Sequence, residues 1–142
     1  MYRFYGWEKA DILPANPEYD KVGNPREMYD YMKGIWSVDS CAPRLRVKWS
    51  EDNITVGQCS ITAFLAQDVY GGEVYGVPLE DGNFHCYNVV GDCVFDLTSE
   101  QFGERVLSYE NNPIQERSVH FAKTEKKERY EMIKDALKKR LE

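Results

Sequence analysis

Residues 57–72 read GQCSITAFLAQDVYGG, and this stretch predicts one helix with a cysteine in its first turn. Thr55 is the candidate cap for its start, and Gly57 allows another part of the backbone to approach closely. The two terminal glycines predict the end of the helix, because glycine readily adopts the positive φ that follows a helix. Cys59 is therefore expected where unpaired N–H groups and the helix dipole favour a thiolate over a thiol.

A second stretch, residues 84–98, predicts a β-hairpin closed by a Gly-Asp turn at residues 91–92. In the register that this turn sets, His85 and Asp96 are diagonal neighbours on one face of the hairpin. A carboxylate that holds one imidazole nitrogen fixes the tautomer and leaves the other nitrogen to face a thiol. With Cys59 on the preceding helix, the sequence predicts a nucleophile, a general base and an orienting acid.

Each of these residues also has a purely structural interpretation. A free cysteine is most often an inert buried hydrophobe, and His85 and Asp96 could be an ordinary strand residue and a turn residue. Their joint occurrence favours the chemical interpretation. Cys86 is expected on the face opposite His85, which argues against it as the nucleophile. His120 is interpreted as a structural residue of a terminal strand.

The group that would stabilise an oxyanion stays open at this stage. The candidates are the backbone N–H of Cys59, the side-chain amide of Gln58, and the pair Trp49 and Ser50. Tyr87 shares a face with His85 in the predicted register and is a candidate substrate-binding residue.

Composition limits the classes of partner and cofactor. The chain has 142 residues, enough for one domain, and a net charge of -6, which argues against a nucleic-acid partner. No apolar run approaches a membrane span and no signal peptide is recognisable, so a cytoplasmic protein is expected. The four cysteines contain no C-x-x-C pair, and reduced thiols are expected with neither a metal nor another cofactor.

The chain divides into an irregular, aromatic-rich arm at residues 1–24 and a single domain at residues 25–142. The aromatic residues of the arm are expected to pack on the domain. Apart from the two stretches above, the pattern predicts a helix at 25–36, a loop at 37–53, a strand at 73–79, a short helical turn at 99–103, a strand at 116–122 and a final helix that begins at Thr124.

These residues resemble two known groups of proteins. A helix that opens with Gly57-Gln58-Cys59, a strand that opens with His85, and Asp96 on the next strand resemble the papain-like cysteine hydrolases, including the NlpC/P60 and transglutaminase-like enzymes. A longer pattern, from about residue 26 to the end, is similar to the YunG family of small bacterial proteins. It comprises Trp49-Ser50, residues 57–63, Gln67-Asp68, Gly71-Gly72, His85, Tyr87-Asn88, residues 96–98, Gln101-Phe102 and residues 129–131.

The resemblance implies an α+β fold with a papain-like core, in which the Cys59 helix packs on a small antiparallel sheet that contains the 84–98 hairpin. It implies a Cys59–His85–Asp96 triad that hydrolyses or transfers an acyl group at an amide bond of a peptide or small molecule, as a peptidase, amidase or deamidase. It supplies no substrate. One departure is Cys86, which stands after His85 where an aromatic residue is usual. The alternative is a binding module that holds a peptide or small ligand in its cleft without turnover.

Overall fold

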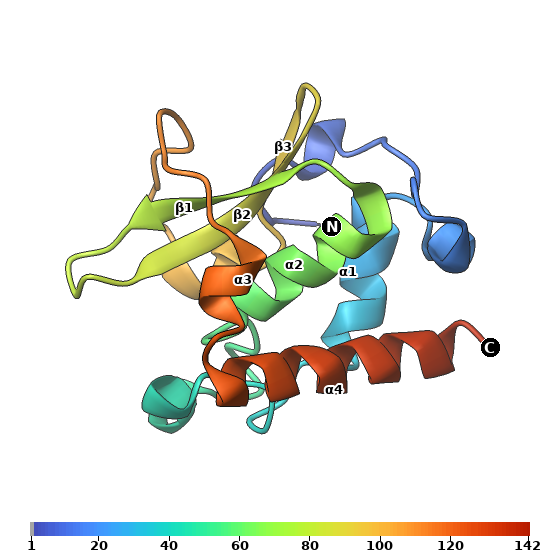
Figure 1. The fold of residues 1–142 in the computed structure, drawn as a ribbon. Coiled ribbons are helices and arrows are strands. Elements are labelled where there is room, and N and C mark those ends of the chain that lie inside the picture. The colour runs from blue at the N-terminus through green and yellow to red at the C-terminus, as the bar shows by residue number, and fades with distance from the viewer. Residues whose placement is uncertain (1) are drawn as a thin grey trace.

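The structure is a computed structural model that describes residues 2–142 as an α+β fold. A three-stranded antiparallel sheet with the order β1-β2-β3 lies on one side of a central helix, and the last helix crosses the other side (Figure 1). The strands are β1 (Glu73–Pro78), β2 (Phe84–Val90) and β3 (Cys93–Phe95), and the helices are α1 (Pro25–Lys33), α2 (Cys59–Tyr70), α3 (Arg117–His120) and α4 (Thr124–Arg140). Short 3₁₀ helices span Trp7–Lys9, Pro17–Val22, Pro43–Lys48 and Ser99–Phe102.

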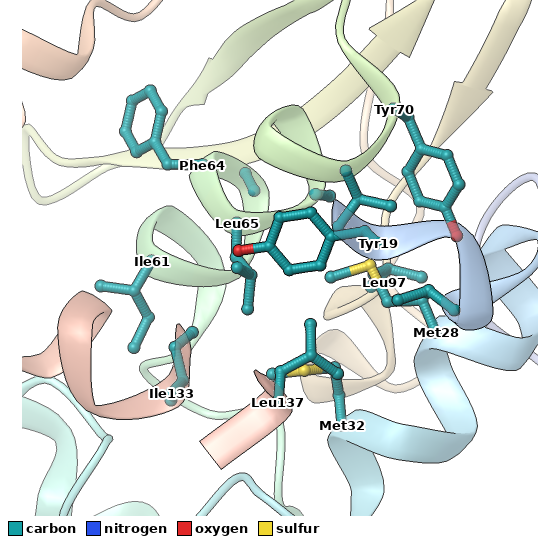
Figure 2. Packing of buried hydrophobic residues seen from close by; sticks show 14 of the residues in the cluster. Tyr19, Met28, Met32, Ile61, Phe64, Leu65, Tyr70, Leu97, Ile133 and Leu137 are labelled. Carbon is teal, nitrogen blue, oxygen red and sulfur yellow. The ribbon is translucent and has the colours of Figure 1, made fainter. Parts of the chain in front are cut away.

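Helix α2 is the central element, as predicted, and it is buried on nearly every side. Figure 2 shows its side chains facing those of α1 and α4 in the hydrophobic core; the labelled members are Tyr19, Met28, Met32, Ile61, Phe64, Leu65, Tyr70, Leu97, Ile133 and Leu137. Burying an aliphatic side chain of this size contributes about 1.5–3 kcal/mol to folding. The packing of α2 therefore fixes the position of the cysteine at its first residue.

The start of α2 differs from the prediction in one respect. The helix begins at Cys59 and Gln58 precedes it without a side-chain cap, while the Thr55 hydroxyl is buried without a hydrogen-bond partner in residues 2–142. Thr55 is thus wrong as the cap. The expected close approach at Gly57 is confirmed, since its φ is 71° and a Cβ there would lie 2.5 Å from the Cys41 sulfur.

The hairpin has the predicted register. Val90 pairs with Cys93, Val89 with Val94 and Asn88 with Phe95, and the Gly91 φ of 59° provides the left-handed first position of the turn. Strand β3 ends at Phe95, so β2 continues towards Phe84 without a strand partner on that side.

The predicted strand at residues 116–122 is wrong, because this segment forms the short helix α3. The free edge of β1 is occupied by the preceding residues instead. Tyr75 forms a bridge with Ile114, the Gly76 amide donates to the Pro113 carbonyl and the Gln115 amide donates to the Val74 carbonyl. Since that edge is filled, the alternation in 116–122 has no strand to pair with.

The arm at residues 2–24 packs on the rest of the chain, as predicted. Phe4, Tyr19 and Val22 are fully or almost fully buried in the main hydrophobic cluster. Tyr5 forms an antiparallel bridge with Asp96, and its carbonyl accepts from the Asp96 amide at 3.0 Å. The arm thereby touches the segment that follows β3. No helix in residues 2–142 has both the length and the apolar composition required to cross a bilayer.

Candidate active site

Cys59 occupies the first position of α2, where the backbone N–H groups have no partners within the helix. Its side chain is half-buried and lines a cleft together with His85. The positive end of the helix dipole favours a negative charge at this position. The local backbone therefore presents a partly accessible sulfur in surroundings that favour the thiolate.

The sulfur of Cys59 lies against the bare edge of β2. The Gly76 amide points away from β2 towards Pro113, so Gly76 and Cys86 form a non-hydrogen-bonded pair and the Cys86 backbone groups point to the opposite edge. Strand β3 does not reach that far. The sulfur lies there, 3.9 Å from the Phe84 carbonyl oxygen.

His85 and Asp96 form a buried pair, each 1% exposed. The imidazole Nε2 lies 2.6 Å from the carboxylate Oδ2. Because Nε2 faces Asp96, Nδ1 is the nitrogen left to interact with Cys59. The Phe102 ring stands perpendicular to the imidazole, with 4.6 Å between the ring centroids, and limits rotation of the His85 side chain.

Further hydrogen bonds hold the Asp96 carboxylate. The Tyr109 hydroxyl donates to Oδ2 at 2.8 Å, and the Thr98 amide donates to Oδ1 at 3.2 Å. A carboxylate that accepts several hydrogen bonds is stabilised in its charged form and fixed in orientation. These hydrogen bonds therefore fix the position of the Asp96 carboxylate behind His85.

The electrostatics of Cys59 and His85 favour an ion pair. A hydrogen bond from the Cys86 thiol is the largest effect on Cys59; with the charge and hydrogen bond of His85 it outweighs burial and brings the pKa of the Cys59 thiol well below its usual value. Burial alone would lower the pKa of His85, but the charges of Asp96 and Cys59 raise it to about 10. Both shifts favour a thiolate at Cys59 and an imidazolium at His85.

A second group of polar residues flanks the sulfur. The Lys126 ammonium donates to His120 Nδ1 at 2.9 Å, and His120 Nε2 lies 2.9 Å from Gln115 Oε1. His120 must then be neutral, with its proton on Nε2. Burial and the nearby Lys126 charge lower the pKa of His120 to about 4. Burial also lowers the pKa of Lys126, whereas the sulfurs of Cys86 and Cys59 act in the opposite direction.

The cleft has a volume of about 960 Å³. Its wall contains both apolar side chains and two ion pairs. The ion pairs join Arg44 to Asp81 at 3.3 Å and Arg105 to Glu80 at 2.7 Å. A cleft of this size holds a small molecule or a few residues of a peptide. Within residues 2–142, no group of three or more potential metal ligands is arranged to bind an ion.

The structure brings Cys59, His85 and Asp96 together but not the predicted oxyanion and substrate-binding side chains. Gln58 is fully buried, with its amide group donating to the Ser37 carbonyl and accepting from the Ser40 hydroxyl. Three other predicted side chains are absent from the cleft wall; these are Trp49, Ser50 and Tyr87. Trp49 donates to the Ile54 carbonyl, and Tyr87 donates to the Tyr109 carbonyl.

Four residues beside the predicted triad were not assigned to the site from the sequence; these are Cys86, Tyr109, His120 and Lys126. Cys86 belongs to the core-facing side of β2, as the predicted register implied, whereas the Cys59 sulfur lies at the strand edge beside the Phe84 carbonyl. The predicted strand at 116–122 concealed His120, because a four-residue helix turns it towards the cleft. The one available signal was that His120 and Lys126 stand close in the sequence, on either side of the start of α4, which would allow their side chains to meet.

Comparison with known proteins gives the family. The model of the YunG protein family matches residues 24–142. The chain belongs to the YunG family. A relative, the uncharacterized protein YunG of Bacillus subtilis (strain 168), is 31% identical over 110 residues, which cover 78% of this chain and 88% of the relative. No solved structure matches the chain. The YunG match includes the whole candidate site and leaves most of the arm outside.

Proposed function

We propose that this YunG-family protein is a cysteine-dependent hydrolase or acyltransferase that acts on an amide bond, with a papain-like arrangement of its core. The observation that supports this most is the half-buried Cys59 sulfur at the start of α2, backed by the 2.6 Å contact between His85 and Asp96. Nucleophile, base and orienting acid are the groups that acyl transfer through a thioester requires.

In the first half-reaction the Cys59 thiolate attacks the amide carbon and a carbon–sulfur bond forms. The unpaired N–H groups at the start of α2 stabilise the oxyanion, since Gln58 is engaged elsewhere. The carbon–nitrogen bond then breaks as His85 gives its proton to the departing amine. The product is a thioester on Cys59 and a neutral imidazole still held by Asp96.

In the second half-reaction neutral His85 takes a proton from water, or from an acceptor amine, as that molecule attacks the thioester. The carbon–sulfur bond breaks, the acyl group leaves as a carboxylic acid or a new amide, and the thiolate–imidazolium pair is restored. Lys126 has no carboxylate partner within 4 Å in residues 2–142. Its charge, held by neutral His120, supports the anionic states of the sulfur and of the oxyanion.

The decisive experiment uses a thiol-directed peptidyl acyloxymethyl ketone probe, with peptide mapping of the modified residue, and turnover of a library of fluorogenic amides. We expect labelling at Cys59 and turnover in the wild type, with both lost in Cys59→Ala. Cys93→Ser is the matched control, because Cys93 is another half-buried thiol outside the cleft. If wild type and Cys59→Ala bind the same ligand and neither turns it over, the protein is a binding module instead.

A further inference from the structure

The cleft that contains Cys59 is positively charged, although the protein is acidic overall. Six basic and three acidic side chains line it, whereas the whole chain carries a net charge of -6. The basic side chains are Arg44, Lys48, Arg105, Lys123, Lys126 and Arg129, and the acidic ones are Glu80, Asp81 and Glu125. A cleft lined by an excess of one sign of charge attracts ligands of the opposite sign.

Each acidic side chain of the cleft is paired with an arginine. The pairs are Glu80 with Arg105 at 2.7 Å, Asp81 with Arg44 at 3.3 Å and Glu125 with Arg129 at 2.8 Å. The positive excess therefore belongs to the three lysines, and none of these has a carboxylate within 4 Å among residues 2–142. An anion that enters the cleft thus meets free ammonium groups, while the carboxylates that would repel it are neutralised.

Lys126 is the lysine that the fold holds in place. It lies in the first turn of α4, it is half-buried, and its ammonium donates to His120 Nδ1 at 2.9 Å. Because Nδ1 accepts this hydrogen bond, His120 is neutral and orients the ammonium without cancelling its charge. The side chain of Lys126 makes no second hydrogen bond within the described part of the chain, so two of its three N–H donors remain for a ligand. A partly desolvated cation is stabilised by an anion that accepts from it.

Lys123 lies next to Lys126 at the start of α4. Its backbone carbonyl accepts from the Lys126 amide at 3.1 Å, so the two residues belong to the same turn of the chain. Both side chains line the cleft that contains Cys59, and that of Lys123 is exposed and therefore free to move towards a ligand. One turn thus presents two ammonium groups to the cleft of the nucleophile.

We propose that the substrates of this site carry a carboxylate, from an aspartate or glutamate side chain or a chain terminus, and that Lys123 and Lys126 bind it. This inference rests on the proposed function, because it names the substrate class of the same site. Carboxylates are the anionic groups that an unmodified peptide offers. Lysine ammonium groups are flexible point charges rather than fixed forks of donors, so they tolerate some variation in where the carboxylate lies along the substrate.

The test compares two alkylating reagents of equal size that differ by one negative charge. They are N-iodoacetyl-glutamic acid α-amide and N-iodoacetyl-glutamine α-amide. Their rates of reaction at Cys59 are measured by peptide mapping near neutral pH, and each is divided by the rate with β-mercaptoethanol. Because both reagents attack the same sulfur, the ratio of the two rates does not depend on how much of Cys59 is thiolate. We expect a preference of about threefold or more for the glutamate reagent at low ionic strength, which should fall as salt is added.

The variant Lys123→Gln/Lys126→Gln should lose this preference. The matched control is Lys127→Gln/Lys139→Gln, which removes the same net charge from two exposed positions of α4 outside the cleft and should keep the preference. Equal rates of the two reagents with the wild type, or an equal loss of preference in both double variants, would overturn the proposal. If the first double variant does not fold, Lys123→Gln replaces it. A ratio that neither Lys123→Gln nor added salt changes would refute the proposal as well.

Turnover separates this inference from the proposed function. The same two acyl groups are placed on a fluorogenic amide, as N-acetyl-glutamyl and N-acetyl-glutaminyl aminomethylcoumarin. Preference for the glutamate reagent without turnover of either amide would refute amide hydrolysis and leave a carboxylate-binding cleft. Turnover of the glutaminyl amide at least as fast as that of the glutamyl amide would refute the carboxylate preference and leave the hydrolase.

Discussion

Tyr109 donates its hydroxyl hydrogen to Asp96 Oδ2 at 2.8 Å, the same oxygen that lies 2.6 Å from His85 Nε2. Tyr109 follows the β2–β3 hairpin by more than ten residues and also stacks on Tyr5 from the arm, with 3.9 Å between the ring centroids. The acid of the candidate triad is therefore held by three separate parts of the chain.

Asp96→Asn should remove the negative charge that keeps His85 protonated. We expect the pKa of His85 to fall from about 10 towards its ordinary value of about 6.5, and the pKa of Cys59 to rise. The rate of alkylation by iodoacetamide as a function of pH measures this change, and Cys59 in the variant should react slowly at pH 6. Tyr109→Phe is the control, because it removes one donor but leaves the charge. Identical pH profiles for wild type and Asp96→Asn would contradict the ion pair.

The thiolate–imidazolium pair also sets the pH dependence of folding stability. The raised pKa of His85 stabilises the fold fully below about pH 6.5, and this contribution is lost as the pH rises through about 10. The lowered pKa of Cys59 stabilises the fold above about pH 8.5, and that contribution is lost as the pH falls through the folded value. Between about pH 6.5 and 8.5 each state holds one proton on the pair, so the two contributions offset each other.

Cys59→Ser should expose the histidine contribution alone. The free energy of unfolding of this variant should fall by up to about 2–3 kcal/mol between pH 6.5 and 8.5, relative to the wild type over the same range. Urea denaturation at several pH values measures the difference, and contributions from other titrating groups, such as His120, largely cancel. Parallel curves for the two proteins would contradict a folded state in which Cys59 is a thiolate and the pKa of His85 stays raised without it.

Lys126→Gln should change both groups that face the ammonium. Removal of the positive charge should raise the pKa of His120 from about 4, and it should slow alkylation of Cys59 at pH 6–7 several-fold. Histidine ring signals in an NMR titration report the first effect. Lys127→Gln is the matched control, because Lys127 is exposed and does not line the cleft. Equal effects of the two variants would show that Lys126 acts only through net charge.

Phe4→Ala should destabilise the fold although residue 4 lies outside the YunG match. The side chain is completely buried and its ring stacks on Tyr29 at 5.3 Å between centroids. A substitution of this kind costs about 3–5 kcal/mol. Chemical denaturation measures the change, with Leu13→Ala as the control at 71% exposure and an expected effect within about 0.5 kcal/mol. A small effect of Phe4→Ala would show that the arm is only loosely attached.

The sequence was sufficient to predict the local geometry of the triad. A two-residue turn with glycine first permits one register, and that register places His85 near Asp96 without knowledge of any other part of the fold. The central helix was equally predictable, because its apolar stretch ends at a glycine pair with positive φ. These features depend on short-range backbone geometry, which is contained in the neighbouring residues.

The remaining parts depend on tertiary contacts. Gln58 directly precedes the cysteine, so the sequence offered its amide as an oxyanion donor. In the structure the amide nitrogen donates to the Ser37 carbonyl and the amide oxygen accepts from the Ser40 hydroxyl. The alternating pattern at 116–122 could not reveal that residues 113–115 already pair with β1.

The bridge between Tyr5 and Asp96 has a practical consequence for fragments of this protein. A fragment trimmed to residues 24–142, the part that matches the family model, would retain every atom of Cys59, His85 and Asp96. It would lose Tyr5, which forms the bridge with Asp96 and stacks on the Tyr109 ring. An inactive trimmed fragment would thus say nothing against catalysis, and assays should be run on chains that keep their first residues.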